Sequence, residues 1–339
     1  MPEPLLMLQD LKTFFYTPDG IVRAVNGVTL DIKPGETLGL VGESGCGKSV
    51  TAHSILRLLP PKRSKIVDGH ILFRRRLESG GEVVDLAAVD YQGDVIRSIR
   101  GNEIAMIFQE PMTSLSPVHT VGSQIAEAVE LHQGVGSAES RERAIAMLTQ
   151  VGIAAPAQRF DEYPHQLSGG MRQRAMIAMA LSCNPSLLIA DEPTTALDVA
   201  IQAQILELMK GLQEEYGMAI LMITHNLGVI AEMADRIAVM YMGKIVEMAD
   251  TRTIFHRPLH PYTIGLLRSV PRMGGNIKDR LVPIPGSVPD PYSVPEGCAF
   301  MPRCPKSNGK PCHITDDVDL VEVEPGHWTR CRYDRWSEP

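Results

Sequence analysis

The sequence has no uninterrupted hydrophobic run long enough to cross a membrane. Its most apolar later stretch, residues 218–242, contains His, Asn, Glu, Asp and Arg side chains that lipid accommodates only at high cost. The N-terminus carries Glu3 where a secretory signal has positive charge, and the apolar run after it is too short for such a signal. We therefore expect a chain that is neither exported nor membrane-spanning.

An excess of positive charge is also missing. The chain has 33 Lys and Arg against 40 Asp and Glu, a net charge of -7, whereas binding to nucleic acid backbones relies on clustered Lys and Arg. We therefore expect no nucleic acid partner. The 339 residues, 44% of them hydrophobic and 22% charged, indicate a globular chain with one large domain and an appendage.

Strand and helix patterns alternate along most of the chain. Short strands are predicted within 22–41, with a buried one at 37–41, and at 70–73, 104–109, 187–190 and 219–224. Helices are predicted at 49–59, 121–147, 170–181 and 199–215. This order favours an α/β fold with a parallel sheet covered on both faces. Prolines become frequent from Pro258 onward, and 283–295 has little periodicity, which indicates a linker or extended tail.

A phosphate-binding loop stands between the first buried strand and the first helix. Residues 42–49, Gly-Glu-Ser-Gly-Cys-Gly-Lys-Ser, fit the pattern G-x-x-x-x-G-K-[ST]. Its glycines let backbone N–H groups converge on phosphate oxygens, and the following helix adds its positive end. Lys48 is expected to reach the β and γ phosphates, and Ser49 to supply a hydroxyl ligand to Mg²⁺.

Two carboxylates end the apolar strand at 187–190. Asp191 is suited to hold magnesium, and Glu192 to polarise the water that attacks the γ-phosphate. The alternative is that the pair forms a helix N-cap before Pro193. Together with the loop, the pair indicates a P-loop ATPase or GTPase.

The segment Leu167-Ser168-Gly169-Gly170-Met171 resembles the signature loop of ABC ATPases, although Met171 stands where the family more often has Gln. It opens a helix, so Ser168 and the glycine amides can grip a γ-phosphate. The resemblance implies that this grip is made across a dimer, on nucleotide held by the opposite subunit. It also implies a P-loop NTPase fold with a RecA-like core, an antiparallel β subdomain and an inserted helical subdomain.

Other positions match the same family one at a time. Gln109 fits the Q-loop glutamine that senses Mg²⁺ and water, His225 the switch histidine, and Asp198 the D-loop aspartate. Phe15 fits the aromatic that stacks on adenine, with Phe14 or Tyr16 as alternatives. The resemblance thus implies catalytic roles for Glu192, His225 and Gln109, and magnesium ligation by Ser49, Gln109 and Asp191. The residues expected to bind ATP are Phe15, Gly42, Glu43, Ser44, Gly45, Cys46, Gly47, Lys48, Ser49, Val50, Gln109, Ser168, Gly169, Gly170, Asp191 and Asp198.

The stretches 256–267 and 109–115 resemble ATPases of oligopeptide and dipeptide importers. This implies an ABC ATPase domain at 1–255, a helical subdomain at about 112–182, and an importer-type extension at 256–339. The implied partners are a second, homologous ATPase chain, two transmembrane permease subunits and an external solute-binding protein. The implied place is the cytoplasmic face of the inner membrane. Nickel or oligosaccharide import, a soluble ABC ATPase acting on nucleic acid or ribosomes, and a regulatory partner that does not hydrolyse ATP are the alternatives.

Four cysteines crowd the C-terminal region with the spacing C-x5-C-x7-C-x18-C: Cys298, Cys304, Cys312 and Cys331. The paired C-x2-C of common zinc modules is missing, so the spacing alone does not identify a metal. Four thiolates suit an iron-sulfur cluster or Zn²⁺. Similar tails in the importer subfamily imply a 4Fe-4S cluster, with zinc or metal-free thiols as alternatives.

Overall fold

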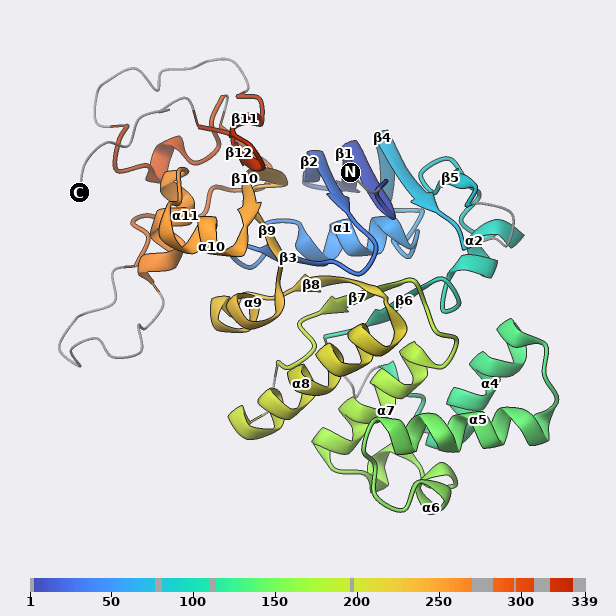
Figure 1. The fold of residues 1–339 in the computed structure, drawn as a ribbon. Helices are drawn as coiled ribbons and strands as arrows, with labels where there is room; N and C mark the ends of the chain where they lie inside the picture. The colour runs from blue at the N-terminus through green and yellow to red at the C-terminus, as the bar shows by residue number, and fades with distance from the viewer. Residues whose placement is uncertain are drawn as a thin grey trace. The chain divides into compact units, whose positions relative to one another are not determined.

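The structure is a computed structural model that describes residues 3–76, 81–109, 114–195, 198–269, 283–295, 297–307 and 318–331. The chain divides into two compact units, whose helices and strands are labelled in Figure 1. The first unit comprises Met1–Leu6, Ile32–Thr37 and Phe73–Ile223. The second unit comprises Met7–Asp31, Leu38–Leu72 and Thr224–Pro339.

A parallel sheet forms the core of the first unit. Its strands lie in the order β8 (Ala219–Ile223), β7 (Leu187–Asp191) and β6 (Ile104–Ile107). Both neighbouring pairs are parallel. Every residue of β7 and β8 is buried, as expected for strands with both faces covered. The predicted α/β class is confirmed by these pairings.

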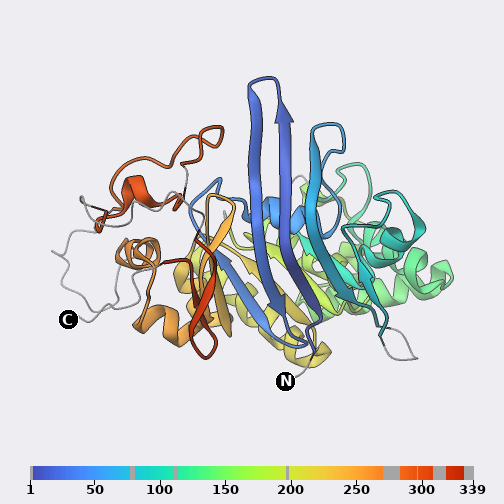
Figure 2. The same ribbon diagram turned by 90° about the horizontal axis from the view of Figure 1, so that it is seen from above.

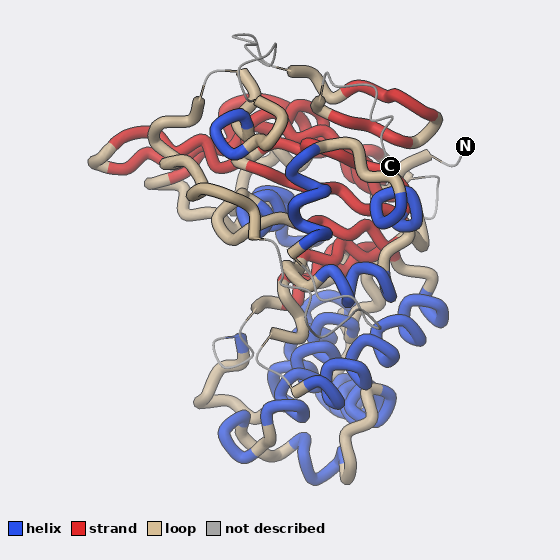
Figure 3. Tube along the Cα trace, turned by 90° about the vertical axis from the view of Figure 1, so that its left-hand side faces the viewer, coloured by secondary structure: helices blue, strands red, loops and turns tan. Residues whose placement is uncertain are grey.

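Helices make up most of the rest of the first unit. They are α2 (Asp94–Ile99), α4 (Val121–Gln133), α5 (Ser137–Gln150), α6 (Pro156–Phe160), η1 (Pro164–Gln166), α7 (Gly169–Leu181) and α8 (Val199–Tyr216), beside the short strand β5 (Val83–Asp85). Helices α4 to α7 pack against one another, and Figure 3 shows this segment as helices joined by loops. The single helical stretch predicted at 121–147 is two helices, because Gly134 adopts a left-handed φ of 64° and ends α4.

The second unit contains a long hairpin and a mixed sheet. The hairpin joins β1 (Leu6–Thr17) to β2 (Gly20–Ile32), and β4 (Ser64–Arg74) pairs beside β1 (Figure 2). In the mixed sheet, β3 (Thr37–Val41) runs parallel to β9 (Arg236–Tyr241). An antiparallel series then continues through β10 (Lys244–Asp250), β12 (His327–Thr329) and β11 (Val321–Glu324).

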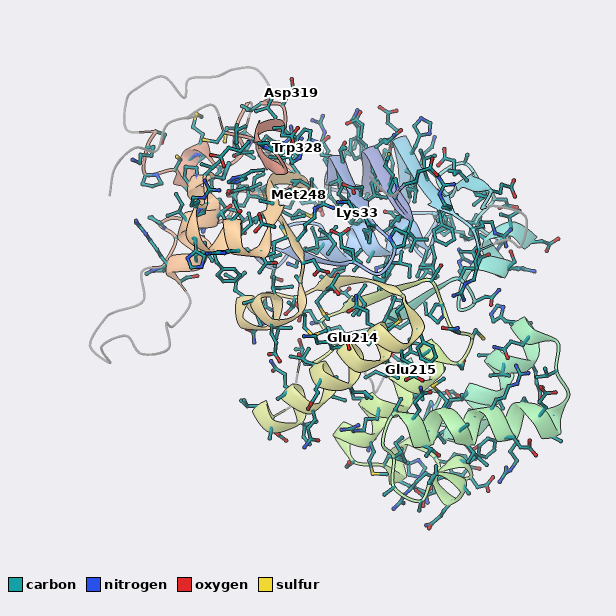
Figure 4. All side chains as sticks on the ribbon, in the orientation of Figure 1. Lys33, Glu214, Glu215, Met248, Asp319 and Trp328 are labelled. Carbon is teal, nitrogen blue, oxygen red and sulfur yellow. The ribbon has the colours of Figure 1, made fainter. Side chains whose placement is uncertain are left out.

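The helices of the second unit are α1 (Lys48–Ile55), α9 (Leu227–Met233), α10 (Thr251–His256), α11 (Pro261–Arg268) and η2 (Met301–Arg303). Helix α1 ends four residues before the predicted end at Leu59, because Arg57 adopts a φ of 54°, which a right-handed helix does not allow. The predicted linker or extended tail contains no helix or strand at 283–295, but the region after Pro258 is not extended throughout. Helix α11 and strands β11 and β12 lie there, and Figure 4 shows Trp328 of β12 beside Met248 of β10, its register partner.

Among the described residues, no helix has the length and hydropathy of a membrane span.

Candidate functional site

The phosphate loop joins buried strand β3 to helix α1 in the second unit. Lys48 is buried, and its Nζ donates to the carbonyl oxygens of Gly42 at 2.8 Å and Glu43 at 3.0 Å. The loop therefore wraps around its own lysine. Burial raises the pKa of the Cys46 thiol, and the nearby Lys48 charge only partly offsets this effect. Cys46 is a neutral packing residue.

At two positions of this loop, any residue larger than glycine would clash with neighbouring backbone. A Cβ on Gly42 would lie 2.2 Å from the Met240 carbonyl oxygen, and one on Gly47 would lie 2.2 Å from the Ala24 carbonyl oxygen. Gly47 also has a φ of 111°, which residues with a Cβ rarely adopt. The loop therefore sits directly against neighbouring backbone. Ser44 and Gly45 are exposed, while Ser49 and Val50 at the helix start are half-buried.

Two further predicted residues lie in the second unit. Phe15 is half-buried on β1 and shares a strand face with Thr13, whose hydroxyl lies 2.9 Å from Ser54 of α1. Phe15 thus projects on the side of β1 that contacts the helix after the phosphate loop. Phe14 projects on the other face, where Arg23 covers its ring at 5.9 Å. His225 is exposed, one residue before Asn226 caps α9.

In the first unit the structure brings Gln109 and Glu192 together. Gln109 Nε2 donates to Glu192 Oε2 at 3.1 Å, and the Thr195 hydroxyl donates to the same oxygen at 2.9 Å. Glu192 has a φ of 49°, a strained conformation for a residue with a side chain. Its N–H donates to the Ile223 carbonyl oxygen at 2.8 Å. Asp191, the last residue of β7, is buried.

The serine-glycine segment opens helix α7. The Ser168 hydroxyl accepts a hydrogen bond from the Met171 N–H at 3.3 Å, so it is the N-cap. Ser168 and Gly169 are exposed. Gly170 is held against α8, because a Cβ there would lie 3.1 Å from the Ile201 side chain. The first turn of α7 therefore presents backbone amides to the outside.

Asp198 likewise caps a helix. Its carboxylate accepts from the Ile201 N–H at 2.9 Å at the start of α8. Its neighbours Ala196 and Leu197, which complete the predicted D-loop, lie outside the described residues.

Two family profiles match parts of this chain. A family profile described as "ABC transporter" matches residues 25–195, and one described as "Oligopeptide/dipeptide transporter, C-terminal region" matches residues 246–312. The chain belongs to the ABC transporter family.

Its relatives span nearly its whole length. It is 53% identical to the "Probable peptide ABC transporter ATP-binding protein y4tR" of Sinorhizobium fredii, covering 96% of this chain and 94% of the relative. It is 47% identical to the "Dipeptide transport ATP-binding protein DppD" of Escherichia coli, covering 97% and 96%. A solved dimer of the ATP-binding cassette MJ0796 bound to ADP and Pi is similar with a TM-score of 0.62 and 28% identity, covering 73% of this chain and 99% of that one.

Within this ABC ATPase, two polar residues near the predicted site were not foreseen. Gln173 of α7 is buried, and its Nε2 donates to the Pro193 carbonyl oxygen at 2.5 Å, which connects α7 to the loop after β7. Thr195 orients Glu192, as described above. A buried amide within an otherwise apolar helix face is the signal that points to Gln173; Thr195 has no comparable signal.

The C-terminal cysteines are only partly described. Cys298, Cys304 and Cys331 are half-buried, and Cys312 lies outside the described residues. Cys298 lines a small pocket together with Phe300 and Arg330. Among the described residues, no three His, Cys, Asp or Glu side chains gather closely enough to hold a metal ion.

Proposed function

We propose that this chain is the ATP-hydrolysing subunit of a bacterial importer that takes up dipeptides or oligopeptides. The observation that carries the proposal is the joint match to the ABC transporter family and to the oligopeptide/dipeptide transporter C-terminal region. The relatives named for peptide or dipeptide transport support the same substrate class.

The residues have separate parts in this proposal. Lys48 and the amides of the phosphate loop bind the β and γ phosphates, and Phe15 stacks on adenine. Glu192 accepts a proton from the attacking water, while Gln109 and Thr195 hold its carboxylate in place. His225 stabilises the charge that develops on the γ-phosphate. Ser168 and the amides of Gly169 and Gly170 grip nucleotide held by a second ATPase subunit, and Asp198 links the two subunits.

Magnesium fits the donors available. A buried Asp191 carboxylate, the Ser49 hydroxyl and the Gln109 amide are the oxygen ligands that this hard cation prefers. When bound, Mg²⁺ neutralises charge on the phosphates as the γ-phosphoryl group is transferred.

Glu192→Gln tests the hydrolytic part of the proposal. The variant is expected to bind ATP as the wild type does. Its turnover number is expected to fall by a factor of about 100 or more, because an amide does not accept the proton. Glu207→Gln, at an exposed position of α8, is the matched control and keeps wild-type turnover. Turnover of Glu192→Gln within a few-fold of the wild type would remove Glu192 from the base role.

The proposed partners are a second, distinct ATPase chain, two permease subunits and an external solute-binding protein. With them the chain acts at the cytoplasmic face of the inner membrane, where closure of the ATPase pair biases the permease between two states. Purification of the complex from its native membrane tests this assembly. Recovery of a homodimer without a permease contradicts it.

Substrate class is tested with the reconstituted complex. Addition of di- or oligopeptide with the binding protein is expected to raise the ATPase rate, whereas nickel and oligosaccharide leave it unchanged. Stimulation by nucleic acid or ribosomes instead would favour the soluble ABC ATPases.

For the C-terminal cysteines we propose a 4Fe-4S cluster, on the basis of four thiolate donors and the importer-type extension. Iron and acid-labile sulfide, at about four of each per chain in anaerobically purified protein, are the expected result. One zinc ion per chain, or no metal, would replace this proposal by the corresponding alternative.

A further inference from the structure

The C-terminal region of the second unit holds the phosphate loop through an ion pair between a buried arginine and a half-buried glutamate. Arg303, the last residue of η2, donates from Nη1 to Glu43 Oε2 at 2.6 Å and from Nη2 to Glu43 Oε1 at 3.0 Å. The two residues are 260 positions apart in sequence, and the Arg303 side chain is only 4% exposed. Such a two-point contact fixes both the distance and the angle of the carboxylate.

Glu43 is held at its main chain as well. Its N–H donates to the Tyr262 hydroxyl of α11 at 2.8 Å, and its carbonyl oxygen accepts from Lys48 Nζ at 3.0 Å. The side chain, the N–H and the carbonyl of this one residue are therefore all occupied. Two of the three partners, Arg303 and Tyr262, come from the C-terminal region, so this region sets the conformation at the start of the phosphate loop.

The partners of Glu43 are themselves fixed. The rings of Tyr241, Tyr262 and Phe300 contact one another with centroids 4.6 to 5.4 Å apart. The Arg303 guanidinium lies 5.9 Å from the Tyr241 ring centroid and 6.0 Å from that of Phe300, and its Nε donates to the Pro285 carbonyl oxygen at 3.1 Å. The Glu43 carboxylate raises the pKa of Arg303, which keeps the guanidinium charged.

We propose that Arg303 is a positioning residue for ATP binding, acting through Glu43 on the phosphate loop. This inference rests on the proposed function, since it concerns the ATP site named there. Two physical effects support it. An ordered loop loses less conformational freedom when phosphate binds, which strengthens binding. The guanidinium also neutralises a carboxylate that would otherwise repel the phosphates from within the loop.

Both effects act before the chemical step. They change how tightly ATP is held and leave the proton transfer at Glu192 as it is, so the Michaelis constant rises and the turnover number stays the same. A residue that served only general stability would instead lower the active fraction, and thus turnover, at an unchanged Michaelis constant.

The experiment measures ATP affinity and steady-state hydrolysis in the full chain assembled with its partners. Arg303→Gln is expected to weaken ATP binding and raise the Michaelis constant roughly tenfold, with turnover within about twofold of the wild type. Arg303→Lys keeps the charge but loses the two-point contact, so about threefold weakening is expected. Arg257→Gln is the matched control and leaves both constants unchanged, because it removes an exposed ion pair with Glu324 in the same unit.

A double-mutant cycle tests the route through Glu43. If Arg303 acts through this carboxylate, Arg303→Gln made on top of Glu43→Gln weakens ATP binding by no more than a further twofold. Tyr262→Phe removes the hydroxyl that accepts from the Glu43 N–H and is expected to weaken ATP binding about threefold. This variant provides a second test if Arg303→Gln does not fold. Wild-type affinity in a folded Arg303→Gln variant, or full additivity in the cycle, overturns the inference. If Arg303→Gln does not fold, wild-type affinity in Tyr262→Phe overturns it.

The same measurements distinguish failure of the proposed function from failure of the positioning role. If the wild-type chain itself does not bind ATP, or Lys48→Ala binds ATP as tightly as the wild type, the nucleotide site is wrong. If the wild type binds ATP, Lys48→Ala does not, and Arg303→Gln binds normally, only the positioning role is wrong.

Discussion

Stability below neutral pH is expected to depend on His260, the N-cap of α11. The residue is 1% exposed, its imidazole Nδ1 accepts from the Tyr262 N–H at 3.1 Å, and its backbone N–H donates to Glu247 Oε2 at 2.9 Å. Burial lowers the pKa of this imidazole from 6.5 to about 4; the Glu247 charge opposes the shift and the Arg330 charge adds to it. His260 is therefore neutral in the folded chain at pH 5.

The magnitude follows from the two pKa values. In the unfolded chain His260 takes up a proton below about pH 6.5, whereas in the folded chain it does so only near pH 4. Its contribution to the free energy of unfolding is therefore complete above about pH 6.5 and falls as the pH is lowered towards 4. Over that window the slope approaches about 1.4 kcal/mol per pH unit, so lowering the pH from 7 to 5 costs about 2 kcal/mol.

Urea unfolding at pH 7 and pH 5 measures this loss. Trp328 lies in β12 of the same unit and reports by fluorescence once Trp336, the other of the 2 tryptophans, is changed to Phe. His260→Asn retains an N-cap oxygen but does not titrate, so it should not show this loss. The difference in free energy of unfolding between the variant and the wild type should therefore shift in favour of the variant by about 2 kcal/mol from pH 7 to pH 5. His256→Asn, exposed on α10, should follow the wild type. Equal pH dependence of wild type and His260→Asn would refute the reasoning.

Three substitutions test other parts of the structure. Glu247→Ala removes a fully buried carboxylate that accepts three hydrogen bonds, and a loss of about 3 to 5 kcal/mol in the free energy of unfolding is expected in the same urea assay. Gly47→Ala places a Cβ 2.2 Å from a backbone oxygen and should abolish ATP binding in a direct titration, whereas Gly136→Ala, which meets nothing within 4 Å, should bind normally. Gln173→Ala frees the carbonyl that it holds after β7, so destabilisation by about 1 to 3 kcal/mol and slower ATP turnover are expected. Unchanged stability, retained binding and unchanged turnover, respectively, would contradict these three expectations.

Local patterns in the sequence were sufficient for the parallel strands and for the phosphate loop. Strands β7 and β8 are short, apolar runs with both faces buried, and their type and place follow from composition alone. The loop at 42–49 is recognisable because its residue pattern is local, although the backbone that excludes a Cβ at Gly42 and Gly47 belongs to Met240 and Ala24, which are distant in sequence. The resemblance to ABC ATPases is confirmed, whereas the roles of the individual site residues stay predictions.

Features that depend on distant parts of the chain were missed. The contact between Arg303 and Glu43 spans 260 positions and has no periodic pattern. The hairpin of β11 and β12 was missed for a different reason. Residues 321–324 alternate Val and Glu, and Pro325 and Gly326 follow as a turn, which is a hairpin signal, but the frequent prolines before it favoured a tail.

The ion pair between Glu43 and Arg303 also restricts how sequence can be exchanged among such chains. Position 43 is one of the variable places in the phosphate-loop pattern, and the pattern alone allows it to change freely. Here its charge is matched by a buried arginine in another segment. A chimera that takes its C-terminal region from another importer should therefore take position 43 from the same importer. Otherwise a half-buried carboxylate or a buried guanidinium is left without its counterpart.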